Sequence, residues 1–84
     1  MIVLARGSIA NRDALAPHRA AEERAVAQLK TDGVMKAAYR RTAEPGVYVV
    51  LEGSSIAAVA DRMNALPFVV EGLMTVDYEE VHEI

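Results

Sequence analysis

The sequence predicts an α+β fold in which the order β-α-β-β-α-β builds one four-stranded antiparallel sheet with two helices on one face. Short runs rich in β-branched and aromatic residues alternate with two longer segments whose apolar residues recur at helical spacing. The link between the second and third runs is so short that we expect a hairpin there. Because 84 residues support one hydrophobic core, we expect a single domain over residues 1–84.

The first strand is expected over residues 1–7, an apolar run that Arg6 and Gly7 end. An amphipathic helix should follow over residues 15–33, with Gly33 at its stop. The stripe of this helix that faces the core consists of Leu15, His18, Glu22, Val26 and Leu29. Two ionisable side chains in an apolar stripe are unusual, because such groups are rarely buried without a partner or a purpose.

The second strand is expected over residues 34–41, where side chains should alternate between the two faces. Strict alternation places Met35, Ala37, Tyr39 and Arg41 on one face and Val34, Lys36, Ala38 and Arg40 on the other. Residues 46–53 form the clearest strand in the chain, and its alternating positions are apolar on both faces.

Ser54 and Ser55 are suited to cap a second helix, whose core stripe carries no polar group. That stripe consists of Ile56, Val59, Ala60, Met63 and Leu66. Pro67 should end this helix, and residues 73–81 should form the last strand. The complete order corresponds to the ferredoxin-like split βαβ motif.

Composition excludes several classes of protein. The net charge of −3 argues against nucleic-acid binding, which requires a basic face, and no stretch approaches the 18 apolar residues of a membrane span. Without cysteine the fold depends on its core alone, so we expect a reducing cytoplasm and a site without thiolate ligands. The 52% hydrophobic content and the uncovered sheet face favour a homodimer or higher homo-oligomer.

Two stretches resemble the muconolactone Δ-isomerase family: GVMKAAYRRTAEPGVYVVLEGSS over residues 33–55 and ALPFVVEGLMTVDYEEV over residues 65–81. The marks are Gly33 before the second strand, the aromatic-Arg step at Tyr39 and Arg40, the hairpin, the serine before the second helix, and Leu66 with Pro67. Pro67 with Phe68 and the nearby Gly72 are similar to YCII-related proteins of the same superfamily.

The resemblance implies a dimeric α+β barrel, in which two sheets pack together and each subunit holds a cleft for a small molecule. Glu22 falls where isomerase-like sequences also carry an acid, and Tyr39-Arg40 falls where they carry a Trp-Arg pair. His18 has no counterpart in that pattern, and residues 6–13 are shorter than is typical for the family.

His18 and Glu22 are the candidate catalytic residues, because one helical turn separates them and such a pair can move a proton on carbon without metal or cofactor. The competing interpretation is a satisfied buried network that joins Glu22 to Arg6, Arg41 or His18. These alternatives predict different hydrogen-bond partners for the Glu22 carboxyl.

Tyr39, Arg40, Arg41 and Tyr48 are the candidate substrate-binding residues. A tyrosine in a strand can also pack in a core or an interface, and the two adjacent arginines should point to opposite faces, so at most one enters a given cleft. The resemblance favours Arg40. The function we expect is isomerase-like proton transfer on a small anionic or lactone-like molecule, and the alternative is a non-catalytic dimeric YCII-like module that binds a small metabolite.

Overall fold

The computed structural model describes residues 1–84 and has the predicted order of strands and main helices. The strands are β1 (Ile2–Ile9), β2 (Met35–Arg40), β3 (Gly46–Glu52) and β4 (Met74–Val81). The helices are the 3₁₀ helix η1 (Arg12–His18), α1 (Arg19–Thr31), α2 (Ile56–Met63) and the short α3 (Pro67–Val70). The sequence did not predict η1 and α3 as separate elements.

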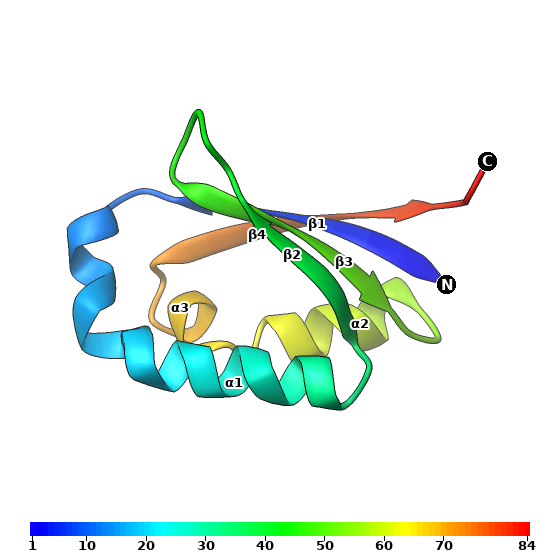
Figure 1. The fold of residues 1–84 in the computed structure, drawn as a ribbon, viewed down its shortest axis with the longest axis horizontal. Coiled ribbons are helices and arrows are strands. Elements are labelled where there is room, and N and C mark those ends of the chain that lie inside the picture. Colours follow the sequence, from blue (N-terminus) through cyan, green and yellow to red (C-terminus); the bar gives the residue numbers. More distant parts are fainter.

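The four strands form one antiparallel sheet in the order β2-β3-β1-β4, with all helices on one face (Figure 1). In the centre, Ala5 of β1 lies opposite Val49 of β3 and Tyr78 of β4. This is the ferredoxin-like α+β fold that the sequence predicts. None of the helices combines the length and apolar character needed to cross a lipid bilayer.

The core lies between the sheet and the helices. Its nine buried residues are Val3, Ala5, Leu29, Met35, Val49, Leu51, Val59, Met63 and Leu66. The opposite face of the sheet, called the outer face below, has no helix against it (Figure 1). Leu4, Tyr39 and Tyr48 are 41%, 62% and 48% exposed there, so apolar and aromatic groups remain uncovered.

Strict alternation along the second strand is wrong, because β2 contains a bulge. Met35 pairs with Leu51 and Ala37 pairs with Val50, so Lys36 is the extra residue. The bulge shifts the alternation by one position, and Met35 therefore shares the helix side with Ala38 and Arg40 rather than with Tyr39.

The continuous helix expected over residues 15–33 is also wrong in detail, since η1 precedes α1 and the two meet near Pro17. At its other end the expectation is confirmed, because Gly33 follows α1 with φ of 76°. The cap of α2 is confirmed as well, because the Ser55 hydroxyl accepts a hydrogen bond of 3.0 Å from the Ala58 N–H. Pro67 follows the second helix as expected and itself begins α3.

Candidate functional site

A cleft opens on the helix side of the sheet, where η1, the start of α1 and α3 approach the hairpin between β2 and β3. Its volume is about 320 Å³, at the lower end of the range for small-molecule sites. The apolar side chains that line it are Ile9, Leu15, Pro45, Val47 and Phe68. The charged side chains that line it are Arg12, Arg19 and Arg40, and no acidic side chain lines it.

The three arginines of the cleft come from different elements: Arg12 from the start of η1, Arg19 from the start of α1, and Arg40 from the end of β2. No carboxylate oxygen lies within 4.0 Å of any of their guanidinium groups. On a chain with net charge −3, this makes the cleft a local concentration of positive charge. Its electrostatics favour an anionic ligand.

Glu22 lies beside this cleft, in the first turn of α1, and is only 7% exposed. Its Oε1 accepts a hydrogen bond of 2.9 Å from the backbone N–H of Phe68, a residue that lines the cleft. Burial raises the pKa of the Glu22 carboxyl, and the Phe68 hydrogen bond opposes this with a smaller effect. No polar side-chain atom of the structure is both fully buried and unpartnered, so Oε2 keeps access to solvent.

The buried network that would join Glu22 to Arg6, Arg41 or His18 is absent. Arg6 pairs with Asp77 at 2.9 Å and Arg41 with Glu44 at 2.7 Å, both away from Glu22. The Glu22 carboxyl instead has a backbone donor from α3. The structure also contains no cluster of side chains arranged to hold a metal ion.

His18 is half-buried at the junction of η1 and α1 and makes no side-chain hydrogen bond, either to Glu22 or to the end of the helix. In a 3₁₀ helix, residues three apart share a face. Arg12, Leu15 and His18 have this spacing, and the first two line the cleft. His18 therefore lies on the row of η1 that faces the cleft, although the imidazole and the Glu22 carboxyl are not in contact.

The six candidate residues of the sequence separate into two groups. His18, Glu22 and Arg40 lie on the helix side of the sheet; of these, Arg40 lines the cleft, and Glu22 is hydrogen-bonded to Phe68, which also lines it. Tyr39, Tyr48 and Arg41 lie toward the outer face, where Tyr39 pairs with Tyr48 across the strands and the Arg41 guanidinium stacks 5.4 Å from the Tyr48 ring centre.

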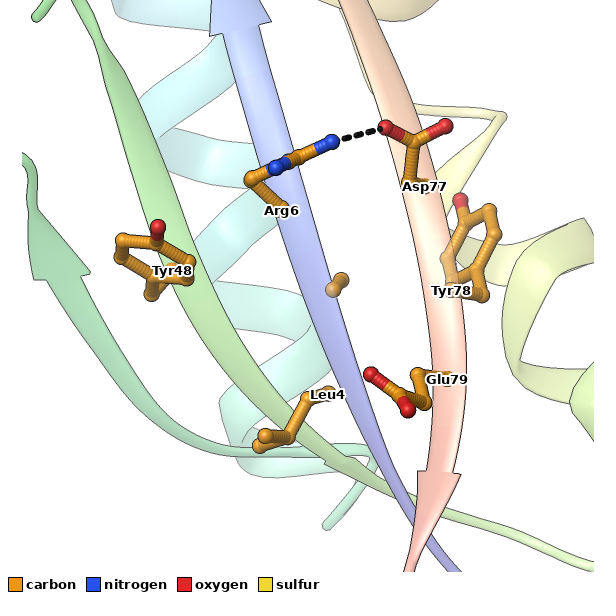
Figure 2. A pocket seen from close by; sticks show the side chains of 7 residues that line it. Leu4, Arg6, Tyr48, Asp77, Tyr78 and Glu79 are labelled. Carbon is orange, nitrogen blue, oxygen red and sulfur yellow. Dashed lines mark hydrogen bonds and ion pairs between the residues drawn. The ribbon is translucent and has the colours of Figure 1, made fainter.

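A second hollow of about 380 Å³ lies on the outer face itself. Figure 2 shows Leu4, Arg6, Tyr48, Asp77 and Glu79 around it, with the Arg6 guanidinium donating to the Asp77 carboxylate. Because its only arginine is already paired and Glu79 adds a negative charge, this hollow suits an anion less well than the cleft does.

The sequence does not predict Arg12 and Arg19 as site residues, because Arg12 precedes the expected helix over residues 15–33 and Arg19 lies outside the apolar stripe of that helix. Phe68 enters the sequence-based expectation only through the family resemblance, without a role in the site. The spacing of three between Arg12, Leu15 and His18 could have indicated that Arg12 shares a face with Leu15, because residues three apart lie on one side of a 3₁₀ helix.

A scan against protein-family models finds no match, and a search of curated protein sequences finds none either. The fold does match solved structures. A 5-chloro-2-hydroxyhydroquinone dehydrochlorinase from Burkholderia phenoliruptrix AC1100, solved with 2,5-dihydroxybenzoquinone, aligns with a TM-score of 0.82 at 16% identity over 98% of this chain and 94% of its own.

A muconolactone isomerase aligns with a TM-score of 0.79 at 16% identity, over 100% of this chain and 91% of its own. A monooxygenase described as one of antibiotic biosynthesis, from Deinococcus radiodurans, aligns less well, with a TM-score of 0.55 at 14% identity over 100% of this chain and 95% of its own. At these identities the likeness concerns the backbone. This chain therefore has the ferredoxin-like α+β fold of muconolactone isomerase and of the dehydrochlorinase.

Proposed function

We propose that this chain is a cofactor-independent enzyme that moves a proton on a small anionic or lactone-like molecule bound in the arginine-lined cleft. The observation that carries this proposal is the buried Glu22 carboxyl, which accepts a hydrogen bond from the backbone of Phe68, a residue that lines a cleft without acidic side chains. Similarity of fold to muconolactone isomerase supports the same class of reaction.

The proposed reaction needs no external oxidant or reductant. The Glu22 carboxylate takes a proton from a carbon next to the carbonyl of the substrate, the double bond shifts by one position, and the proton returns to another carbon. A carboxyl whose pKa is raised by burial is suited to this work, because it is a stronger base when ionised and holds the proton more readily between the two steps.

The arginines supply the second requirement, stabilisation of the negative charge that develops on the enolate oxygen. Arg40 is the last residue of β2 and lines the cleft, and its guanidinium has no acidic partner, so it is free to pair with a carboxylate or an enolate oxygen. His18 is proposed as a second proton carrier at the end of the η1 row.

We also propose a homodimer in the cytoplasm, in which a second copy covers the outer face. Tyr39, Tyr48 and Arg41 then contribute to that interface rather than to the cleft. The exposed Leu4, Tyr39 and Tyr48 support this arrangement, because contiguous apolar surface in water is unfavourable and marks interaction sites.

The test is proton exchange in D₂O, followed by ¹H NMR on a panel of small unsaturated lactones and keto acids. Loss of a C–H signal reports proton abstraction even when no product accumulates. We expect the wild type to catalyse exchange on a member of the panel and Glu22→Gln to reduce the rate by about 10² to 10⁴, the range for a general base.

Glu23→Gln is the matched control, because Glu23 is the next acid on α1, is exposed and makes no ion pair. Its exchange rate should equal that of the wild type. Exchange retained in Glu22→Gln would remove Glu22 from the mechanism. Ligands that bind the wild type and Glu22→Gln equally, with no exchange in either, would instead identify a non-catalytic binding module.

A further inference from the structure

We propose that the ligand of the cleft is a small dicarboxylate with a short apolar chain between its two carboxylates. The proposal rests on the assignment of the cleft as the functional site and names the class of molecule that it takes. It follows from the number of unpaired cations in the cleft, from its apolar lining and from the elements that contribute the cations.

The number of cations exceeds what a monoanion can neutralise. Three guanidinium groups line one cleft of about 320 Å³, and none has a carboxylate within 4.0 Å. The other arginines that approach the sheet differ, because Arg6 and Arg41 each have an acidic partner. A single carboxylate engages one guanidinium fork in bidentate fashion, so a ligand with two carboxylates can pair with more of these three exposed arginines than a monoanion can.

The arginines also approach the cleft from two sides. Arg40 extends from the sheet, whereas Arg12 at the start of η1 and Arg19 at the start of α1 belong to the helical layer. A ligand that satisfies both sides must carry two separated anionic groups. One carboxylate would pair with Arg40 and the other with the arginines of η1 and α1.

The lining between these cations is apolar. Among the residues that line it, Leu15 is buried, and Val47 and Phe68 are half-buried. Such a surface favours a hydrocarbon segment and gives no hydrogen bond to the oxygens of a compact anion. A carbon dianion therefore fits better than inorganic phosphate, whose charge is concentrated on one centre.

The experiment is a titration of the ¹⁵N-labelled wild type with three probes: glutarate, its monomethyl ester and inorganic phosphate. The ester keeps the carbon chain of glutarate, adds one methyl group and removes one charge. We expect glutarate to shift the amide signals of Gly46, Val47 and Phe68 and to bind at least about tenfold more tightly than the ester. All titrations use the same low ionic strength and a buffer without carboxylate, because salt screens these interactions.

Arg40→Gln should weaken glutarate binding to about the affinity of the ester, whereas Arg24→Gln should leave it unchanged. Arg24 is the matched control, since it is an exposed arginine of α1 that does not line the cleft. Equal affinities for glutarate and the ester would overturn the proposal. Phosphate that binds as tightly as glutarate would overturn it too, in favour of a compact anion.

This test is independent of proton exchange, because it measures binding alone. Preference for glutarate without any Glu22-dependent exchange would support the dicarboxylate and refute the enzyme. Glu22-dependent exchange on a monoanion, with no preference for glutarate, would support the enzyme and refute the dicarboxylate.

Discussion

At the scale of single residues, Glu22 is subject to two opposed effects on its protonation. Burial disfavours the charged carboxylate and raises its pKa, and the hydrogen bond from the Phe68 N–H favours the charged form. Burial is the larger effect, so the folded protein holds the proton of Glu22 more tightly than the unfolded chain does. In the folded protein, burial therefore favours the neutral carboxyl, whereas the Phe68 N–H favours the carboxylate.

The sign of this effect predicts how stability depends on pH. Because the pKa of Glu22 is higher in the folded protein, its contribution to the free energy of unfolding is complete below its unfolded pKa and is lost as the pH rises through the folded value. Glu22→Gln cannot titrate. We therefore expect the stability of the wild type relative to Glu22→Gln to fall as the pH rises from well below to well above the ordinary pKa of a glutamate side chain.

Urea denaturation of both proteins across that pH range measures this difference. Glu23→Gln serves as the control, and its difference from the wild type should not follow the same curve, because Glu23 is exposed. A difference between the wild type and Glu22→Gln that is constant with pH would show that Glu22 is not desolvated.

Gly46, a buried residue that lines the cleft, is the basis of a second single-residue prediction. Its φ is 151°, and a Cβ built there would lie 2.1 Å from the carbonyl oxygen of Gly7. Gly46→Ala should destabilise the protein by about 2 kcal/mol or more. The alanine would adopt an unfavourable φ, and the backbone at Gly7 would have to move away from the new Cβ. Gly72→Ala should cost only about 1 kcal/mol, because it meets backbone strain alone.

Gly72 is a suitable control, because its φ is also positive, at 72°, but no atom lies within 4 Å of a Cβ built there. The difference between the two variants thus isolates the contact with Gly7. Urea denaturation of the two variants gives that difference directly. Equal losses of stability would mean that β1 and the hairpin separate easily at this point.

At the scale of elements, the division between η1 and α1 decides what reaches the cleft. Pro17 lacks an N–H and disfavours helical backbone in the residue before it, so a continuous α-helix through residues 15–19 is costly. The Asn11 side chain accepts a hydrogen bond of 3.1 Å from the Asp13 N–H and starts η1 early. The 3₁₀ turn then directs Arg12 and Leu15 to one side.

The cap at the start of α2 leads to a prediction about the stability of this helix. The Ser55 hydroxyl accepts the N–H of Ala58, whereas the neighbouring Ser54 is exposed and caps nothing. Ser55→Ala should reduce the free energy of unfolding by about 1 kcal/mol, and Ser54→Ala should change it by less than about 0.5 kcal/mol. Thermal denaturation compares them, and equal effects would contradict the assigned cap.

At the scale of the whole molecule, the two faces of the sheet differ in how far they are covered. Helices cover one face of the sheet, and the outer face presents Leu4, Tyr39 and Tyr48 to solvent (Figure 1). A chain of 84 residues buries a limited share of its surface and is only marginally stable by itself. Covering the outer face with a second copy would add apolar burial where the single chain lacks it.

The prediction at this scale is a change of assembly. Tyr48→Glu places a charge at the centre of the outer face, so we expect it to convert a dimer into a monomer. Val70→Glu is the control, since Val70 of α3 is 66% exposed but lies on the helix side. Sedimentation velocity distinguishes the species, and a monomeric wild type or a dimeric Tyr48→Glu would refute the interface.

Local signals in the sequence determined the strands, the two main helices, the Ser55 cap, the glycine after α1 and the inward direction of Glu22. These features depend on residues within a few positions of one another, so apolar periodicity and capping residues predict them. The exposed apolar outer face was predictable for the same reason, because alternation along β3 is apolar on both sides.

Only the tertiary structure decided which arginine faces the cleft and what holds Glu22. A bulge at Lys36 sets the face of Arg40, and bulges depend on the register with the neighbouring strand. The donor to Glu22 is the N–H of Phe68, 46 residues away, and Arg12 reaches the cleft only because η1 packs beside the hairpin. Such contacts arise from the packing of distant segments, which no local pattern of residues encodes.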